Sequence, residues 1–150
     1  MKTQELSFVF PVMPLAVQSV RFASAGGIAR KYQPRKSVSY KRALRYLCLQ
    51  QLPVGFEPWD CPLKVEVQFI YPAPKSFSQK KIQQIKNGEI FYKFTRPDLQ
   101  DNLMKATSDA LTGIIWSDDS RICVLESTKI YGLSPEIRLK AIPLKDERCD

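Results

Sequence analysis

The chain has 150 residues with 23 lysines and arginines, 15 aspartates and glutamates and no histidine, which gives a formal net charge of +8 at pH 7. The absence of histidine excludes serine–histidine and cysteine–histidine nucleophiles and removes the commonest general base. The four cysteines, Cys48, Cys61, Cys123 and Cys149, show no CxxC spacing, which argues against zinc and for a reduced, cytoplasmic protein. The length predicts one domain, residues 1–150, and no apolar run approaches a membrane span.

The N-terminal third of the chain is strongly basic. Leu6 to Phe10 is a short apolar run ended by Pro11, and it predicts the first strand. Between Leu6 and Phe56 there is no acidic residue, but there are eight lysines and arginines. Such a cluster favours a polyanion as partner, because phosphate backbones bind basic residues through counterion release. The alternative is a solvated basic face.

Two elements are expected in this basic third. Gly26–Gly27 predicts a flexible loop over residues 21–36, followed by a helix that Ser37 caps and that runs to about Gln51. The buried face of this helix would carry Tyr40, Ala43, Leu44 and Leu47. The basic residues predicted to contact DNA from this region are Arg21, Arg30, Lys31 and Lys36.

The middle of the chain predicts a strand and a short helix. Leu63 to Tyr71 alternates apolar and polar residues, which is typical of a strand, and Pro72 ends it. Ser78 can cap a short helix, and the loop after it interleaves lysines with Phe91, Tyr92 and Phe94. That mixture suits contacts to phosphates and unstacked bases, and equally suits aromatics packed into the core or a dimer interface. Lys93 and Arg96 are predicted DNA contacts.

The stretch from Arg96 to Ile122 holds five of the 15 acidic residues of this basic protein. Pro97 disfavours helix for the residue before it, so a helix is expected to start at Asp98 or Asp101 and to end at Gly113. Its apolar face would consist of Leu103, Ala106, Ala110 and Leu111, and its polar row of Asp101, Lys105 and Asp109.

After this helix the chain is expected to return as a sheet. Ser117 to Ser120 predicts a turn, and residues 122–131 and 136–142 predict two antiparallel strands joined around residues 132–135. The return could bring Asp118 and Asp119 back towards the start of the helix, so that two acidic points converge.

Each acidic residue also has a simpler interpretation. Asp98 and Asp101 could only cap the helix and oppose its dipole, and Asp118 and Asp119 could only form a solvated turn. Lys105 could simply pair with Asp101 one turn away. Converging aspartates are, however, what hard cations such as Mg²⁺ and Mn²⁺ require. Without histidine, a metal-activated water is the natural nucleophile for a phosphodiester, and Lys105 could stabilise the charge that develops on the phosphate.

The same stretch resembles the signature of RusA-type endonucleases, the Holliday junction resolvases common in prophages. Three separated blocks match in order and spacing. They are Pro97–Asp98 with Asp101–Asn102–Leu103 and Lys105–Ala106, then Asp109–Ala110–Leu111–Thr112–Gly113, then Trp116 with Asp118–Asp119–Ser120 and Ile122. One feature departs from the family pattern, because Leu99 and Gln100 both stand between the first two aspartates, where the pattern has a single residue.

The resemblance implies a Mg²⁺-dependent phosphodiesterase, with Mn²⁺ as a substitute, that acts as a homodimer on four-way junction DNA in recombination and repair. It assigns catalytic roles to Asp98, Asp101, Lys105 and Asp119. The metal ligands would be Asp98, Asp101 and Asp119, with Asp118 as a further ligand or a neighbour of the ligands. The alternatives are a non-catalytic protein that binds branched or single-stranded DNA and a nuclease that acts on RNA.

The predicted fold is therefore a single RusA-like α+β domain. It would have a mixed or antiparallel sheet of about four strands and about three helices. The predicted function is cleavage of branched DNA, and the homodimer is expected only through the resemblance.

Overall fold

A mixed sheet of four strands lies at the centre of the molecule, in the order β1, β6, β4, β5. The computed structural model describes residues 4–15, 21–26, 28–32 and 35–145. Within them the sheet strands are β1 (Leu6–Phe10), β4 (Leu63–Pro72), β5 (Ile122–Gly132) and β6 (Glu136–Pro143). β4 runs parallel to β5, whereas the β1–β6 and β4–β6 pairs are antiparallel.

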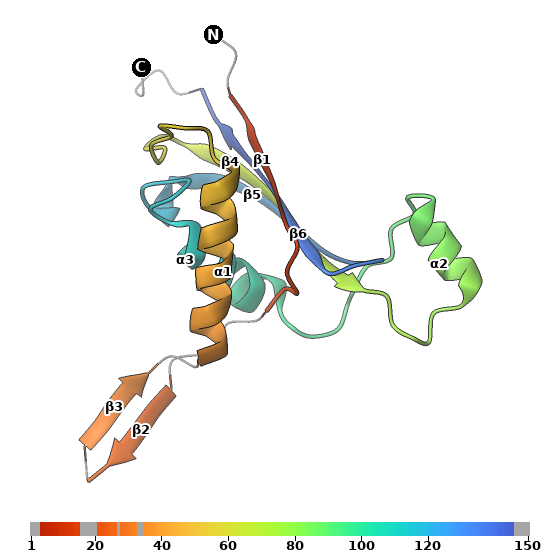
Figure 1. The fold of residues 1–150 in the computed structure, drawn as a ribbon, viewed down its shortest axis with the longest axis horizontal. Coiled ribbons are helices and arrows are strands. Elements are labelled where there is room, and N and C mark those ends of the chain that lie inside the picture. Colours follow the sequence, from red (N-terminus) through yellow and green to blue (C-terminus); the bar gives the residue numbers. More distant parts are fainter. Residues whose placement is uncertain (1–3, 16–20, 27, 33–34, 146–150) are drawn as a thin grey trace.

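The helices complete the predicted α+β class. α1 (Arg35–Gln51) and α3 (Lys105–Leu111) pack against each other beside the sheet, whereas α2 (Gln79–Lys86) stands apart from it (Figure 1). The expected single-domain arrangement with a four-stranded sheet and three helices is thus confirmed. None of the helices that the structure describes is long and apolar enough to cross a membrane.

The core lies between one face of the sheet and the helices α1 and α3. Alternate residues of the strands point inwards because successive side chains of a strand point to opposite faces. The predicted apolar face of the helix after Pro97 is confirmed, since Leu103, Ala106 and Leu111 are fully buried. On α1, Tyr40 and Leu44 are buried as expected, and Leu47 packs against the core from a partly buried position.

The pairing expected between the last two strands is wrong. β5 and β6 follow each other in the chain, but β4 lies between them and pairs with both. Two alternating runs joined by a short turn look alike in sequence whether they pair directly or admit a third strand. The structure has the second arrangement, in which β4, with five of its residues fully or almost fully buried, takes a central place in the sheet.

The expected loop over residues 21–36 is also wrong. β2 (Arg21–Ala25) and β3 (Ile28–Tyr32) form an antiparallel hairpin, with Ala25 paired to Ile28. Gly26 has a φ of +61°, a conformation that glycine adopts without a steric penalty. Gly26 therefore lies in the turn of a hairpin rather than in a flexible loop. α1 then starts at Arg35, so Ser37 is buried within the first turn instead of capping the helix.

Candidate functional site

The acidic stretch begins with an unusual helical turn. Residues Leu99–Met104 form a π-helix, η1, which continues into α3. The amide of Leu103 donates to the carbonyl of Asp98 at 3.2 Å, a bond that spans five residues instead of four. A π-turn is how a helix accommodates one additional residue, and such turns occur often at functional sites. The turn thus absorbs the extra residue between Asp98 and Asp101, and the helix returns to α geometry at Lys105.

Among the described residues, the carboxylates of Asp98 and Asp101 make no hydrogen bond or ion pair that stabilises the fold. Asp98 occupies the N-cap position of η1, but its side chain makes no capping hydrogen bond, so the capping role considered for it is wrong. Asp101 is exposed, and among the described residues its carboxylate has neither an ion pair nor a hydrogen bond. Both side chains are therefore available to an external ligand.

Lys105 and Asp109 occupy the next turns of the same polar row, as predicted. Lys105 is exposed and, within the part of the chain that the structure describes, makes no ion pair with Asp101. Asp109 behaves differently, because its carboxylate lies 3.6 Å from the ammonium of Lys41 on α1. Asp109 thus links α3 to α1, whereas Asp101 and Lys105 are unused by the fold.

The second acidic pair lies on the turn before β5. Asp118 caps the short 3₁₀ helix η2 (Asp119–Arg121) by accepting from the amide of Ser120 at 2.9 Å. Hydrogen bonds from Ser120, together with the nearby Arg121, hold the pKa of Asp118 below its usual range. Asp118 therefore combines a capping role with a charge that is kept at neutral pH, and Asp119 is exposed beside it.

This turn is fixed by a residue that the sequence analysis missed. Asp60 accepts from the hydroxyl of Ser117 and from Nε of Arg121, both at 2.6 Å. The bond from Ser117 and then Arg121 lower the pKa of Asp60. The amide of Ser117 also donates to the carbonyl of Trp59 at 2.9 Å. The turn is therefore held to the loop after α1, and no local sequence signal marks Asp60 for this role.

The two acidic pairs lie at opposite ends of one helix, so the expected return of Asp118 and Asp119 towards the start of the helix is wrong. Asp98 and Asp101 flank its start, whereas Trp116, two residues before Asp118, bonds through Nε1 to Thr112 at its end. In the described ranges no group of three or more histidine, cysteine, aspartate or glutamate side chains surrounds a common point. The carboxylate oxygens suit a hard divalent cation, but one chain presents them as two pairs rather than one closed set.

Two lysines, Lys93 and Lys129, lie beside the first acidic pair, Asp98 and Asp101. Lys129 on β5 donates from Nζ to the carbonyls of Thr95 and Pro97, the latter at 2.7 Å. Burial and the neighbouring Lys93 lower the pKa of Lys129, and the charge of Asp98 acts in the opposite direction. Lys129 thus fixes the backbone directly before Asp98. This role of Lys129 is not recognisable in the sequence, because a lysine on a partly exposed strand gives no local sign of a partner more than thirty residues away.

The residues predicted to contact DNA are spread over three regions. Arg21, Arg30 and Lys31 lie on the strands of the β2–β3 hairpin, and their side chains lie outside what the structure describes. Lys36 is exposed in the first turn of α1. Lys93 and the exposed Arg96 flank the approach to Asp98. The structure thus places Lys93 and Arg96, but not the hairpin residues, next to the acidic helix.

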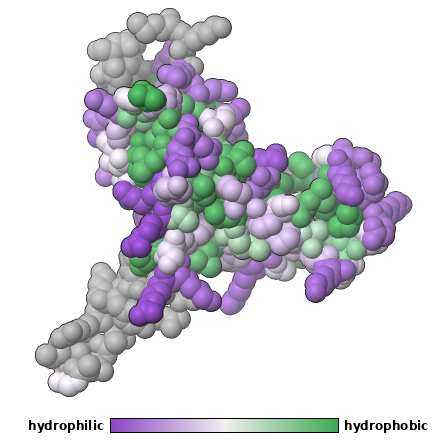
Figure 2. Space-filling model, in the orientation of Figure 1, coloured by the Kyte–Doolittle hydropathy of each residue, from purple (hydrophilic) through white to green (hydrophobic). Residues whose placement is uncertain are grey.

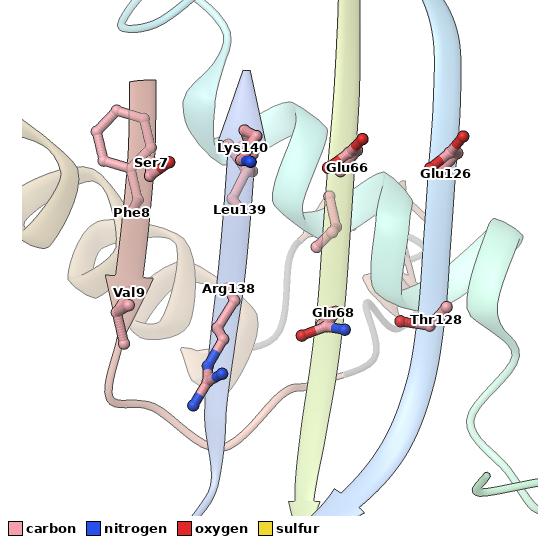
Figure 3. A pocket seen from close by; sticks show the side chains of 11 residues that line it. Ser7, Phe8, Val9, Glu66, Gln68, Glu126, Thr128, Arg138, Leu139 and Lys140 are labelled. Carbon is pink, nitrogen blue, oxygen red and sulfur yellow. The ribbon is translucent and has the colours of Figure 1, made fainter. Parts of the chain in front are cut away.

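A hollow of about 400 Å³ lies elsewhere, on the sheet face turned away from the helices (Figure 3). It contains Glu66 and Glu126, but Lys64 pairs with both carboxylates at 3.3 Å. The hydrogen bond to Glu66, followed by the one to Glu126, raises the pKa of Lys64. Because both of its carboxylates are already paired with Lys64 and none of the predicted site residues lines it, this hollow is not the candidate site.

Comparison with known proteins decides the family. A family model described as "Endodeoxyribonuclease RusA" matches residues 11–141, which include every acidic residue of the candidate site. The chain belongs to the RusA family of endodeoxyribonucleases. A RusA protein named "Crossover junction endodeoxyribonuclease rusA", from Lactococcus phage r1t, is 32% identical over 137 residues, 91% of this chain and 95% of its own length. The uncharacterized protein YqaN of Bacillus subtilis (strain 168) is 29% identical over 128 residues, 84% and 87% of the two chains.

This membership confirms the family resemblance of the acidic stretch and the predicted enzyme class, an endonuclease that acts on DNA. The individual roles of the site residues remain predictions.

Proposed function

We propose that this RusA-family chain is a divalent-metal-dependent endonuclease that resolves Holliday junctions by paired cleavage near the branch point, in DNA recombination and repair in the cytoplasm. The observation that carries the proposal is the contrast along one helix. Asp101 and Lys105 are exposed and unpaired among the described residues, whereas Asp109 on the same polar row is bound to Lys41. Side chains that a fold leaves unpaired on a rigid helix are available for substrate and metal.

The proposed chemistry follows from the donor types. Two pairs of aspartates, Asp98 with Asp101 and Asp119 with Asp118 as a further ligand, would hold Mg²⁺ or Mn²⁺, which would supply a water of lowered pKa and neutralise phosphate charge. Lys105, one turn after Asp101, would bind the phosphate oxygens as negative charge develops on them. Lys129 would keep Asp98 in place by holding the carbonyls of Thr95 and Pro97.

The proposed assembly is a homodimer, as the family resemblance implies. A four-way junction offers two equivalent strands, and a dimer brings two copies of each carboxylate pair to one branch point. Because a single chain presents its acids as two pairs at opposite ends of a helix, the second copy also supplies carboxylates that one chain does not gather.

The proposed DNA surface includes Arg21, Arg30 and Lys31 of the hairpin, Lys36 at the start of α1, and Lys93 and Arg96 beside the acidic helix. α1 extends this surface, since it carries five lysines and arginines and no acidic residue. Of its cations, only Lys41 forms an ion pair within the described residues. Hydrophilic side chains stand out along the exposed side of α1 (Figure 2).

Replacing Arg42 and Arg45 together with Gln is expected to weaken binding to any duplex arm. DNA binding releases about one counterion for each phosphate contact. Because the variant makes two contacts fewer, the slope of log K against log salt should flatten by roughly 2. The measurement is fluorescence anisotropy with labelled DNA, without divalent metal, at four or more salt concentrations.

The matched control replaces Arg138 and Lys140 with Gln. These residues pair with Glu136 and Glu5 and line the sheet face away from the helices (Figure 3). Both double variants lose the same net charge, so an effect of overall charge would flatten both slopes equally. Equal flattening would count against α1 as a phosphate contact.

The function itself is tested with a synthetic four-way junction and a matched linear duplex. Each is incubated with and without Mg²⁺, using the native protein and the Asp119→Asn variant. Paired, symmetric nicks near the branch point that need both Mg²⁺ and Asp119 are the expected result. Tight junction binding without nicks in any divalent ion would instead favour a non-catalytic binder of branched DNA. Preferential cutting of a matched RNA substrate would favour an RNA-directed nuclease.

A further inference from the structure

The segment before the acidic helix presents a row of apolar side chains to solvent. Ile90, Tyr92 and Phe94 are 54%, 63% and 94% exposed, respectively. The residues between them turn inwards: Phe91 packs edge-to-face on Phe77, with ring centroids 5.8 Å apart, and the ammonium of Lys93 lies 5.0 Å from the ring centre of Tyr71. This alternation is that of an extended strand, and it places three apolar side chains on one outer side.

This segment is anchored rather than loose. The amide of Tyr131 donates to the carbonyl of Phe91, and the amide of Lys93 donates to the carbonyl of Lys129, both at 2.9 Å. Beyond Phe94, Nζ of Lys93 donates to Oγ1 of Thr95 at 2.7 Å, and Lys129 holds the carbonyls that follow. Phe94 therefore lies between two fixed points, and its exposure is built into the fold.

The surroundings of Phe94 identify the kind of partner. Phe94 stands four residues before Asp98, between Lys93 and Arg96, and Lys129 lies beside the same stretch. A phenyl ring held outwards on an anchored segment offers its face to a flat apolar partner. The adjacent cations add a requirement for negative charge. An unstacked nucleobase with its flanking phosphate satisfies both.

We propose that Phe94, supported by Tyr92, stacks on an unpaired base at the branch point and so distinguishes a junction from linear duplex. The inference rests on the proposed junction substrate, but not on cleavage. In a linear duplex every base is already stacked between its neighbours, so the ring finds no partner there. At a branch point the stack is interrupted, and the ring replaces a missing neighbour.

The test measures binding of the full-length protein without divalent metal. A junction carries the fluorescent base 2-aminopurine at the branch point, and a linear duplex carries it at an internal position. Native protein is expected to change the fluorescence of the junction alone. Phe94→Leu, which keeps an apolar side chain but removes the ring, is expected to bind the junction about tenfold more weakly and the duplex unchanged. Phe94→Tyr keeps the ring and is expected to restore both the affinity and the fluorescence change.

Several outcomes would overturn the inference. Equal losses on junction and duplex, or no loss on either, would show that the ring does not recognise the branch point. Conversion of the native oligomer to a smaller one in Phe94→Leu, measured by light scattering, would show that a second copy of the chain covers the ring. The binding test contains no metal and is therefore independent of cleavage. A native protein that binds the junction as expected here, but never cuts it in the separate assay with Mg²⁺, would refute the proposed function and leave this inference standing.

Discussion

Asp101→Asn is expected to reduce junction cutting by about a hundredfold or more while junction binding stays the same or tightens. The substitution keeps the shape of the side chain but removes the charge that would hold a divalent ion. Binding does not suffer, because one repulsive charge near the phosphates is lost. Single-turnover cutting with Mg²⁺ and gel-shift binding without it measure the two effects separately.

Asp109→Asn is the matched control for this prediction. It makes the same chemical change on the same polar row, but at a carboxylate that already pairs with Lys41 at 3.6 Å. The pair is partly exposed, so its loss should cost less than about 1 kcal/mol of stability and leave cutting near the native rate. Similar losses of cutting in both variants would indicate a general charge effect along η1 and α3, and native cutting by Asp101→Asn would remove Asp101 from the site.

The elements that local patterns determine were predicted well. The strand Leu6–Phe10 has the predicted bounds, and the strand predicted to end at Tyr71 ends one residue later. Ser78 caps α2 as expected by accepting from the amide of Lys81 at 3.2 Å. In each case the deciding interactions lie within a few residues, where alternation, proline and capping chemistry act.

The features that depend on distant partners could not be predicted in this way. The insertion of β4 between β5 and β6 is a choice among non-local pairings that share one alternating pattern. The Gly26–Gly27 pair is compatible with both a loop and a hairpin turn, and only the pairing of β2 with β3 decides between them. The π-turn of η1 is a small shift of hydrogen bonding that helix periodicity does not reveal.

The candidate site also combines features that local patterns determine with features that depend on distant partners. The motif around Asp98 and Lys105 was recognisable, because its spacing lies within one short stretch. The residues that hold the motif were not: Arg121 bonds to Asp60 across 61 positions, and Lys129 bonds to Pro97 across 32. Spacing in the sequence therefore indicated the chemistry of the site but not the contacts that position it.

Trp116→Ala is expected to destabilise the fold by about 3–5 kcal/mol, because it removes a fully buried indole and leaves a cavity in the core. Nε1 of Trp116 also donates to Oγ1 of Thr112 at 3.0 Å, which joins the acidic turn to the end of α3. The melting temperature should fall by roughly 10 °C. Chemical denaturation monitored by circular dichroism measures the free energy of unfolding directly.

Trp116→Phe separates packing from hydrogen bonding in this prediction. Phenylalanine keeps most of the aromatic volume but has no N–H donor, and the hydroxyl of Thr112 still donates to the carbonyl of Ser108 at 2.8 Å. No buried group is left without a partner by this change, so the loss should be only about 1–2 kcal/mol. If Phe and Ala cost the same free energy, the hydrogen bond rather than the filled core would be what holds the acidic turn to α3. Cutting by Trp116→Phe should then fall together with its stability, whereas a packing role predicts near-native cutting below the melting transition.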